Sequence, residues 1–548
     1  MKKLINLFII IISILSFTCL TACRKIVKEN DIVVLYTNDV HCAIDDNIGY
    51  SSLKAFKDEV KSKTDYVTMV DLGDAVQGSF IGSISSGEYI MDIMNECEYD
   101  MFILGNHEFD YGMDKLANNL NKFKGTTLAC NFKYTGSGEN KLDMVKPYKI
   151  VEYGDKKIGY ISVATPKSIT SSTPANFMEG DEFVYSFYGD YETNETNFYK
   201  LVQETIDEVH TYNVDYCILL THLGDKNAFA PYDSVSLINN TNGVDAVLDG
   251  HAHSEIVSKD VKNKNGEKVI LSSTGTKLKH IGELVIGSDG KITTSFVSNY
   301  NKKDSKVDAL IESIMSQYEE QLNVVISHTN YDLKIKDAVG LRLVRQRETN
   351  LGDLVADAYR VMTGADIGIQ NGGGVRVDIK KGDITYKNVY DVLPFGNQII
   401  VVNVTGQQIL DILEFSVKNV TRDYVLNFSE FGGFLQVSGL TFDVNTSIDS
   451  PIVLKKDNTF DKIEGDRRVS NVKVLEKGTY VDIDINKTYT LAGSNYVILE
   501  GGDGNTILSG VERANSFDQV DYQVFVDYLL SLSSLDEYKS EQDRINVK

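Results

Sequence analysis

The sequence predicts an α/β protein of two domains, and three observations support this prediction. The chain has 548 residues, and a single hydrophobic core rarely serves a chain of this length. Its first half contains short apolar runs that each end in a polar cluster, a pattern typical of buried strands. All eight histidines lie at or before His328, whereas ten of the eleven arginines lie at or after Arg342. Because histidine binds metals and arginine binds phosphates and carboxylates, we expect a metal-bearing first half and an anion-binding second half. The simpler alternative is that two unrelated domains differ in their use of these residues for no functional reason.

The beginning of the chain has the layout of a secretory signal. Two lysines precede an apolar stretch, and small residues precede a cysteine. The tetrapeptide LTAC at 20–23 resembles the bacterial lipobox, which implies cleavage before Cys23 and lipidation of this cysteine. We therefore expect a signal peptide at 1–22, a tether at 23–30, and an extracytoplasmic protein anchored by lipid to the bacterial cell membrane. The alternative is an uncleaved transmembrane anchor, for which the apolar stretch is short.

The formal net charge of −23 limits the possible partners. Loss of Lys2 and Lys3 with the signal peptide would make the charge −25. A protein this acidic is not expected to bind a nucleic-acid polymer. It can still bind a small anionic substrate, provided that the site itself is locally positive.

Five predicted strands end in polar clusters that contain metal-binding side chains. In layered α/β proteins, ligands bind beyond the carboxyl ends of the strands, so we expect the five clusters to lie close together. On an extended strand end, residues i and i+2 share a face, so His251 and His253 can approach the same site. The five runs with their clusters are 31–41, 66–79, 99–110, 216–225 and 244–254.

Together these clusters offer seven nitrogen or oxygen donors. Mixed imidazole, carboxylate and amide ligands suit Zn, Mn, Fe or Co rather than a cysteine-lined structural zinc site. Seven donors exceed one tetrahedral site but suit two metals that share a bridging carboxylate, and two metals about 3.5–4 Å apart support phosphoryl transfer. A single histidine after a strand is more often structural, so the prediction rests on the whole set. Its members are Asp39, His41, Asp74, Asn106, His222, His251 and His253.

A helix is predicted between the two halves. Apolar residues recur at helical spacing over 306–326. We therefore expect a first domain at 31–303, a connecting helix at 304–328 and a second domain at 329–548.

Ordered motifs over residues 32–530 resemble a known enzyme family. In the first half, NDVH, GDAVQGS, GNHEFD, THLG and GHAHS are similar to the calcineurin-like metallophosphoesterase superfamily. In the second half, RETNLGDLVADAY, QNGGGVR, LPFGN, FLQVSGL and GGDGN extend the resemblance to the secreted 5′-nucleotidase family, which includes bifunctional UDP-sugar hydrolase/5′-nucleotidases. The resemblance implies a four-layer αββα metallophosphoesterase domain, the connecting helix, and an α/β C-terminal domain that binds substrate.

The same resemblance implies roles for the donors and for two of their neighbours. One metal would be held by Asp39, His41, Asp74 and His253. The other would be held by Asp74, Asn106, His222 and His251, with Asp74 as the bridge. His107 and Asp110 match the catalytic dyad, in which protonated His107 stabilises the developing charge and assists the leaving alkoxide. Glu108 and Asp71 match no ligand, and we expect both to support the turns around the ligands.

On the substrate side, four residues of the second half match family contacts. Arg347 and Arg376 match arginines at the phosphate, and Asn371 matches a residue near the ribose. Phe395 matches one of two aromatics that sandwich the base, with a core aromatic as the alternative. The family usually has the second aromatic directly after GGDG, where this chain has Asn505. One face of the base would therefore be uncovered unless another aromatic fills the gap, and stacking contributes roughly 1–3 kcal/mol per base.

These features lead to one expected function and two kinds of alternative. We expect extracytoplasmic, metal-dependent hydrolysis of nucleoside 5′-monophosphates to nucleoside and phosphate. The same dinuclear site could serve a 2′,3′-cyclic-nucleotide phosphodiesterase/3′-nucleotidase or a UDP-sugar hydrolase. A nucleotide-binding surface lipoprotein without turnover is the alternative of another class, and the His107–Asp110 dyad argues against it. The expected cofactor is two divalent metal ions, and the expected partners are a small nucleotide or related phosphoester and, through Cys23, the membrane.

Overall fold

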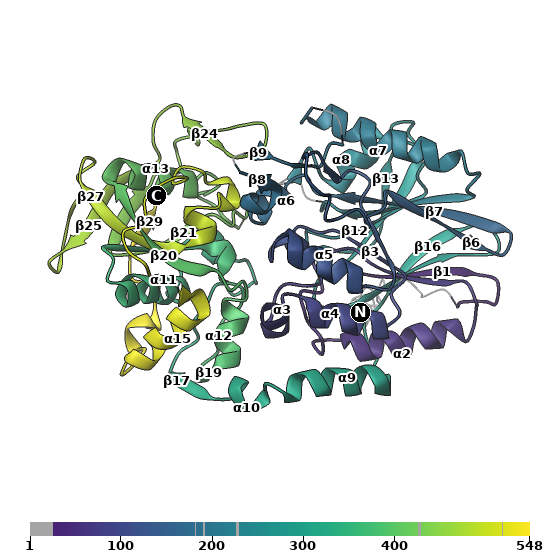
Figure 1. Cartoon of the computed structure of the whole chain (residues 1–548), viewed down its shortest axis with the longest axis horizontal. Coiled ribbons are helices and arrows are strands. Elements are labelled where there is room, and N and C mark those ends of the chain that lie inside the picture. Colours follow the sequence, from purple (N-terminus) through teal and green to yellow (C-terminus); the bar gives the residue numbers. More distant parts are fainter. Residues whose placement is uncertain (1–25, 181, 190–191, 226–228, 426–428, 518) are drawn as a thin grey trace, which may run out of the picture.

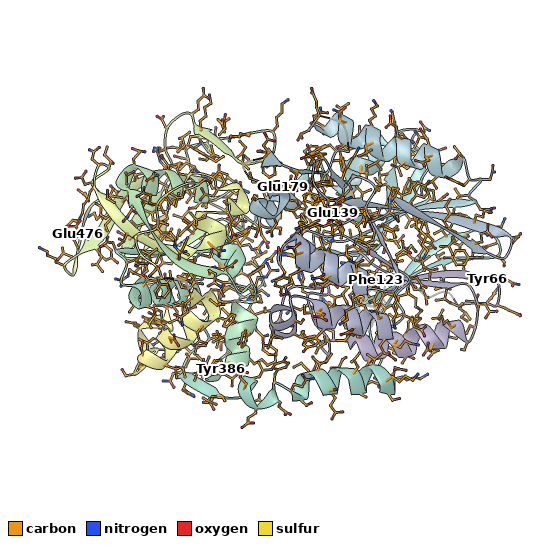
Figure 2. The ribbon with its side chains drawn as sticks, viewed as in Figure 1. Tyr66, Phe123, Glu139, Glu179, Tyr386 and Glu476 are labelled. Carbon is orange, nitrogen blue, oxygen red and sulfur yellow. The ribbon has the colours of Figure 1, made fainter. Side chains whose placement is uncertain are left out.

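Two domains lie side by side along the long axis of the molecule (Figure 1). The computed structural model describes residues 26–180, 182–189, 192–225, 229–425, 429–517 and 519–548. Tyr66 lies at the free end of the first domain and Glu476 at the free end of the second (Figure 2). The predicted signal peptide and Cys23 lie outside the described residues, so the lipid anchor stays a prediction. Among the helices that are described, none has the length and apolar character needed to cross a membrane.

Two six-stranded sheets form the first domain. The strand order is β16-β15-β1-β2-β3-β4 in one sheet and β13-β14-β12-β11-β7-β6 in the other. The central pairs of both sheets are parallel. The first sheet consists of β1 (Ile32–Thr37), β2 (Val67–Asp71), β3 (Met101–Ile103), β4 (Thr126–Leu128), β15 (Ile281–Ile286) and β16 (Ile292–Val297). The second consists of β6 (Tyr148–Tyr153), β7 (Lys156–Ala164), β11 (Tyr216–His222), β12 (Ala246–Asp249), β13 (Glu255–Lys262) and β14 (Lys268–Thr274).

The central strands of these sheets are buried on both faces. In β1, Val34 and Tyr36 share an apolar core with Leu220 of the opposite sheet. Val33 and Leu35, on the other face of the same strand, belong to the core that includes the flanking helices. This double burial explains why the strands read as continuous apolar runs rather than as an alternating pattern.

Helices cover the outer faces of both sheets. In Figure 1 the strands lie between α7 and α8 on one side and α2 and α4 on the other. The helices α2 and α7 contact β2 and β7, respectively. The predicted αββα arrangement of four layers is therefore confirmed. The flanking helices are α2 (Gly49–Lys61), α4 (Glu88–Glu96), α5 (Met113–Lys122), α7 (Glu195–His210) and α8 (Ser234–Asn240).

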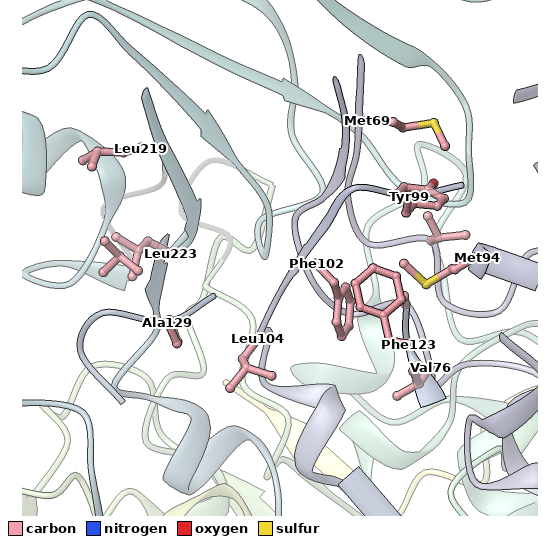
Figure 3. Close-up of a cluster of buried hydrophobic side chains, with 14 of the residues drawn as sticks. Met69, Val76, Met94, Tyr99, Phe102, Leu104, Phe123, Ala129, Leu219 and Leu223 are labelled. Carbon is pink, nitrogen blue, oxygen red and sulfur yellow. The ribbon is translucent and has the colours of Figure 1, made fainter. Parts of the chain in front are cut away.

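An apolar cluster supports the ends of the strands of the first sheet (Figure 3). The rings of Phe102 on β3 and Phe123 after α5 meet edge to face, with centroids 5.9 Å apart. Met94 and Tyr99 belong to the same core. Leu104, also in this core, directly precedes the polar turn that begins at Gly105, so packing here fixes where that turn starts.

The second domain combines a five-stranded sheet with a four-stranded sheet. Their orders are β21-β18-β27-β20-β28 and β26-β25-β22-β29. The helix α11 (Asn350–Thr363) packs against the larger sheet. It begins at Thr349, whose Oγ1 accepts a hydrogen bond from Gly352 N at 3.2 Å, and it ends at Gly364, whose φ of 71° favours glycine. The strands of these two sheets are β18 (Ile367–Asn371), β20 (Gln398–Thr405), β21 (Leu435–Ser438), β22 (Leu440–Val444), β25 (Val469–Glu476), β26 (Thr479–Asp482), β27 (Thr488–Ser494), β28 (Gln519–Val520) and β29 (Ile545–Val547).

The connection between the domains is only partly helical. The helices α9 (Ser305–Ser316) and α10 (Glu319–Leu322) are followed by β17 (Val325–Thr329), which pairs antiparallel with β19 (Gly382–Thr385). The predicted helix at 304–328 therefore ends earlier than expected. Its last residues are β-branched, which favours a strand once a partner strand is available.

Aromatic residues join the two domains beside this connection. Phe80 of α3 (Phe80–Ser85) packs against Tyr318, with ring centroids 5.2 Å apart. The same phenyl ring lies 4.9 Å from the ring of Tyr390 in α12 (Tyr386–Val392). These contacts fix one edge of the cleft between the domains.

The Phe102→Ala substitution should lower the free energy of unfolding by about 3–5 kcal/mol, because it removes a fully buried ring and leaves a cavity. Phe183→Ala, at an exposed ring, is the matched control and should change stability by less than about 0.5 kcal/mol. Denaturant titration followed by circular dichroism measures both. Equal stabilities of the two variants would contradict the proposed role of this cluster.

Candidate metal centre and substrate cleft

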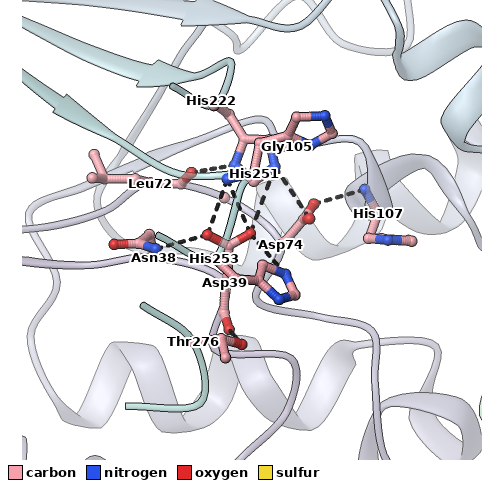
Figure 4. A network of polar contacts seen from close by, with 12 residues as sticks. Asn38, Asp39, Leu72, Asp74, Gly105, His107, His222, His251, His253 and Thr276 are labelled. Atoms are coloured by element: carbon pink, nitrogen blue, oxygen red, sulfur yellow. Dashed lines mark hydrogen bonds and ion pairs between the residues drawn. The ribbon is translucent and has the colours of Figure 1, made fainter. Parts of the chain in front are cut away.

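Loops at the carboxyl ends of five strands bring the predicted metal ligands together (Figure 4). Two groups form, and within each group the ligand atoms lie within 4.8 Å of one another. The Nε2 atoms of His41 and His253 are 3.1 Å apart, as two imidazoles around one ion would be. The first group is Asp39, His41 and His253, and the second is Asp74, His222 and His251.

Asp74 stands between the two groups. Its Oδ2 atom lies 3.1 Å from His222 Nε2 and 3.9 Å from His41 Nε2. Its Oδ1 atom accepts a hydrogen bond from the backbone N–H of His107 at 2.9 Å. Asp39 Oδ1 also lies 3.5 Å from His253 Nε2 and 4.0 Å from His222 Nε2. Both carboxylates therefore contact histidines of the two groups, and Asp74 Oδ2 makes the shortest of these contacts.

The ligand loops adopt an unusual backbone conformation. Five of the ligands have positive φ, a region that non-glycine residues rarely occupy and that costs on the order of 1–3 kcal/mol each. Hydrogen bonds between the loops hold it: Asp39 N donates to Gly73 O at 3.0 Å and His41 N donates to Asp74 O at 2.9 Å. Such strain is typical of functional sites. The five φ values are 51° for Asp39, 49° for His41, 58° for Asp74, 76° for His251 and 53° for His253.

Backbone carbonyls orient two of the imidazoles. The Nδ1 atom of His41 lies 2.9 Å from Gln77 O, and that of His222 lies 2.6 Å from Leu72 O. A carbonyl can only accept, so Nδ1 carries the proton in each ring and the Nε2 lone pair faces the centre. Metal-binding histidines are commonly oriented in this way.

One side-chain oxygen at the centre, Asn106 Oδ1, has no protein partner among the residues described. It is inaccessible and makes no hydrogen bond there. Buried polar atoms are almost always satisfied, so this oxygen requires a partner that the protein does not supply. An amide oxygen fits a divalent metal ion. The donor set therefore fits the metals that the sequence predicts.

Burial and nearby charges set the protonation states of the ligands, and they favour the metal-binding form at four of them. Burial works to lower the pKa of His222, but Asp74 and Asp39 outweigh it and raise this pKa to about 10, while burial raises the pKa of Asp39 to about 7. Burial lowers the pKa of His41, His251 and His253 well below the usual value, so these rings are neutral. Burial alone would raise the pKa of Asp74, but the neighbouring His222 and His107 outweigh it and the net pKa is well below the ordinary range. Neutral imidazoles and an ionised carboxylate are the forms that bind metal.

Two further carboxylates shape the loops, in the places predicted for them. Glu108 accepts hydrogen bonds from the backbone N–H groups of Asp74, Ala75 and Gly105 at 2.7–2.9 Å. Asp71 accepts one from Thr37 Oγ1 at 2.6 Å and one from Gly73 N at 3.0 Å. Both side chains are thus engaged by the loops that carry ligands.

His107 faces the cleft and is held by Asp110. The Nδ1 atom of His107 lies 2.7 Å from Asp110 Oδ2, and Ser172 Oγ donates to Asp110 Oδ1 at 2.8 Å. Burial works to lower the pKa of His107, but Asp110 and Asp74 outweigh it, so the pKa is raised. The ring is therefore held in one orientation and favours its protonated form, as the dyad predicted from the sequence requires.

A cavity of about 380 Å³ extends from the metal ligands into the second domain. This volume is in the range of small-molecule sites. Residues from both domains line the cavity, so neither domain forms it alone. The lining includes Asp74, Asn106, His107, Asp110, His251 and His253 from the first domain, and Arg342, Arg345, Asn371, Arg376, Phe395, Lys418, Phe431, Tyr496 and Asp503 from the second.

Three arginines of the second domain supply positive charge to this cavity. Arg376 is buried, which lowers its pKa to about 10, and its guanidinium lies 5.5 Å from the ring centroid of Phe395. Arg342 and Arg345 both pair with Glu430, the former through Nε at 2.9 Å and the latter at 3.2 Å. The buried Nε of Arg345 has no partner among the described residues. Burial lowers the pKa of Arg345 to about 9, so Arg345 and Arg376 remain positively charged near neutral pH, as an anion site requires.

Two predicted substrate residues do not line the cavity. The guanidinium of Arg347 donates to the backbone carbonyls of Gln346, Thr421 and Arg422 and lies 5.3 Å from the ring centroid of Tyr424. Asn505 is 5% exposed and accepts a hydrogen bond from Ile507 N at 3.3 Å. Both side chains thus make their contacts within neighbouring loops, and the substrate roles considered for these two positions stay predictions.

Two other residues, Arg345 and Phe431, line the cavity and were not predicted from the sequence. Arg345, two positions before Arg347, points into the cavity because the short helical turn at Leu343–Arg345 aims the two guanidinium groups differently. Phe431 lines the cavity beside the GGDG loop. A Cβ atom at Gly432 would lie 2.4 Å from Asp503 Oδ1, so the two glycines after Phe431 permit the contact between these loops. The sequence FGG at 431–433 is the pattern from which this contact could have been predicted.

Comparison with protein families assigns both halves. Residues 32–255 match the calcineurin-like phosphoesterase family. Residues 325–510 match the 5′-nucleotidase C-terminal domain family.

Individual relatives and solved structures are similar over most of the chain. The trifunctional nucleotide phosphoesterase protein YfkN of Bacillus subtilis (strain 168) is 26% identical over 92% of this chain, which spans 34% of that protein. The 5′-nucleotidase of Vibrio parahaemolyticus serotype O3:K6 (strain RIMD 2210633) is 25% identical, with 92% of this chain and 90% of that protein covered. The crystal structure of the 5′-nucleotidase precursor from Thermus thermophilus superposes with a TM-score of 0.76 at 26% identity, over 94% of this chain and 99% of that one.

The Asp74→Asn substitution should reduce bound divalent metal by about one equivalent per chain or more, because this carboxylate contacts both ligand groups. His107→Ala is the control from a neighbouring loop: it removes a ring that is in neither ligand group, so metal content should not change. Elemental analysis of the purified, dialysed proteins measures both. Full metal content in Asp74→Asn would rule out the bridging role.

Proposed function

The chain belongs to the 5′-nucleotidase family of calcineurin-like phosphoesterases and is a phosphoric ester hydrolase, and we propose that it hydrolyses nucleoside 5′-monophosphates to nucleoside and phosphate. One observation carries the proposal. A single cavity is lined by metal ligands and His107 at the first domain, and by arginines, polar groups and aromatic rings at the second. It thus offers a reactive centre together with contacts for a phosphate, a sugar and a base.

Two divalent metal ions are part of the proposal. Asp39, His41, Asp74 and His253 would hold one, and Asp74, Asn106, His222 and His251 the other. When bound, the ions would supply the positive charge that activates water and neutralises phosphoryl oxygens. Nitrogen and oxygen donors favour Zn, Mn, Fe or Co.

His107 is the proposed catalytic residue of the chain itself. Its imidazolium would stabilise the charge that develops on the phosphoryl oxygens and would give its Nε2 proton to the leaving alkoxide. Asp110 holds Nδ1 at 2.7 Å, which fixes the ring with Nε2 free for the substrate. This pair supports turnover rather than binding alone.

The arginines would bind the phosphate from the other domain. Arg376 and Arg345 line the cavity with buried guanidinium groups, and the unpartnered Nε of Arg345 supplies a donor for an anion. Arginine remains charged there and donates in a fixed planar geometry that suits phosphate oxygens.

Asn371 and Asp503 would bind the sugar. Asn371 Nδ2 donates to Asp503 Oδ2 at 3.0 Å, and both side chains line the cavity. Asp503 also adopts a positive φ of 55°, a conformation that Tyr496 supports by accepting a hydrogen bond from Asp503 N at 3.1 Å. The carboxylate of Asp503 can accept hydrogen bonds from the hydroxyls of a ribose.

Phe431 would provide an aromatic wall for the base, whereas the ring of Phe395 lies 5.9 Å from that of His107 and 5.5 Å from the Arg376 guanidinium, at the proposed phosphate end of the cavity. Both rings line the cavity, and Phe431 belongs to the loop next to Asp503. Phe431 would therefore cover the face that Asn505 leaves open. Base stacking on such rings is tolerant of sequence because every base has a π face.

We also place the enzyme outside the cytoplasm, anchored to the bacterial cell membrane through Cys23, on the strength of the sequence of its first 23 residues. The proposed partner is a small nucleotide rather than a nucleic-acid polymer, in keeping with the formal charge of −23.

Phosphate release from AMP tests the proposed function. The purified protein should release phosphate with Mn²⁺ and lose this activity in EDTA. Parallel assays with a 2′,3′-cyclic nucleotide and with UDP-glucose separate the monophosphatase from the alternatives. Turnover of either of these with none of AMP would refute the proposal while leaving phosphoesterase chemistry intact.

Asp110→Asn should move the alkaline limb of the pH profile of kcat/KM to lower pH. The protonated form of His107 is the active one, so activity is present below its pKa and is lost as pH rises through it. Asp110 raises this pKa, and the neutral amide no longer does. Ser172→Ala keeps the charge of Asp110 and should shift the limb less. An unmoved limb in Asp110→Asn would contradict the assignment of His107 as the acid.

Phe431→Ala should raise KM for AMP by roughly tenfold with little change in kcat, because stacking contributes about 1–3 kcal/mol away from the reacting phosphate. Phe431→Tyr keeps the ring and is the matched control, with KM near that of the wild type. Steady-state kinetics measure all three proteins. An unchanged KM in Phe431→Ala would remove Phe431 from the base site.

A further inference from the structure

Lys418 occupies an unusual place in the wall of the cavity. It follows α13 (Gly406–Ser416), and its side chain lines the cavity next to Phe431. The ammonium nitrogen lies 4.0 Å from the ring centroid of Phe431 and 3.9 Å from that of Phe415. These two rings meet at an interplanar angle of 67° with centroids 5.7 Å apart, so the ammonium sits in the notch between them. Cation–π contacts thus hold the charge against one proposed base wall.

The ammonium of Lys418 lacks an acceptor. It makes no hydrogen bond or ion pair with any residue that the structure describes. Burial lowers its pKa to about 8, although Asp503 opposes this shift. An ammonium has three donors and no acceptor, and rings satisfy none of these donors by hydrogen bonding. A buried ammonium without an acceptor therefore favours a ligand that provides a hydrogen-bond acceptor.

Other polar residues of this cavity have protein partners or proposed roles at the phosphate and the sugar. Arg342 and Arg345 are both paired with Glu430, and Arg345 and Arg376 lie where the phosphate is proposed to bind. Asp503 and Asn371 are hydrogen-bonded to each other at the proposed sugar site. Phosphate and sugar are thus accounted for, and the group left within reach of Lys418 is the base stacked on Phe431.

The bases differ in what they offer to an ammonium. Guanine, hypoxanthine and uracil carry an exocyclic carbonyl oxygen (O6 or O4) that accepts hydrogen bonds, whereas adenine and cytosine carry an amino donor at the corresponding position. A donor facing an ammonium is unfavourable, and an oxygen facing it gains a charge-assisted hydrogen bond. We propose that Lys418 is a specificity-determining residue that contacts the oxo group of the base, so that nucleotides with oxo bases are the preferred substrates. This inference rests on the proposed function.

A second phosphoryl group on the substrate is the competing ligand for the same ammonium. The contact with Phe431 favours the base, because the ammonium lies 4.0 Å from the centroid of the ring on which the base is proposed to stack. The flexible four-carbon stem of lysine allows the ammonium to move from the ring face to the edge of a bound base.

Matched pairs of substrates test the inference. IMP and AMP, and UMP and CMP, differ chiefly in an oxo group against an amino group. We expect kcat/KM to be about tenfold higher for IMP than for AMP, and for UMP than for CMP, a ratio that corresponds to about 1.4 kcal/mol. In Lys418→Gln the ratios should fall to within about twofold of one, because the amide can accept from an amino group as well as donate to an oxygen. Lys167→Gln, which removes an ammonium elsewhere in the same cavity, should keep the wild-type ratios.

Binding of the nucleosides separates this inference from the proposed function. Calorimetry with inosine and adenosine needs no turnover, and inosine should bind more tightly to the wild type but not to Lys418→Gln. If no nucleotide is hydrolysed yet this difference is found, the proposed function fails and the inference stands. Wild-type ratios near one, ratios retained in Lys418→Gln, or the binding of neither nucleoside would overturn the inference. A second phosphoryl group would be the ligand of Lys418 if the wild type preferred adenosine 3′,5′-bisphosphate to AMP and Lys418→Gln abolished only this preference. That result would also overturn the inference.

Discussion

The structure depends on one constraint: seven polar donors must converge in a mostly buried site. Burying such groups close together is costly, so the loops that carry them must be held firmly. Five of the ligands adopt positive φ, and Asn106 Oδ1 makes no hydrogen bond among the described residues. Hydrogen bonds from the same loops to Glu108 and Asp71 offset part of this cost. The parallel strands of two packed sheets are what bring the five loops to one place.

The division of labour between the domains follows from charge. The first domain concentrates imidazole and carboxylate groups, and residues 25–341 contain no arginine. A phosphate near these carboxylates needs cations, and the second domain supplies Arg342, Arg345 and Arg376 across the cleft. The cavity is therefore complete only where the domains meet, which the packing of Phe80 against Tyr390 helps to fix. Arginines gathered on one wall of the cleft, in a chain with a formal charge of −23, suit a small anion rather than a polymer.

The sequence predicted the first domain more fully than the cleft. Apolar runs ending in Asp, Asn and His identify strand ends directly, and the four-layer fold follows from the family resemblance. The substrate side is harder because side-chain direction decides it. Arg345 and Arg347 lie two positions apart, yet only Arg345 reaches the cavity, since carbonyls of Thr421 and Arg422 capture the other guanidinium. Phe431 takes the place expected for an aromatic at Asn505 because two loops that are distant in sequence meet at Gly432. Contacts of this kind arise only in the folded chain.

The most direct test of this account is a crystal structure of the protein grown with Mn²⁺ and phosphate, with anomalous data collected at the manganese edge. The account predicts two anomalous peaks about 3.5–4 Å apart. One should lie among Asp39, His41 and His253 and the other beside His222 and His251, with Asp74 between them. The phosphate should contact both ions and Arg345 or Arg376. A single peak, or two peaks that Asp74 does not join, would contradict the account.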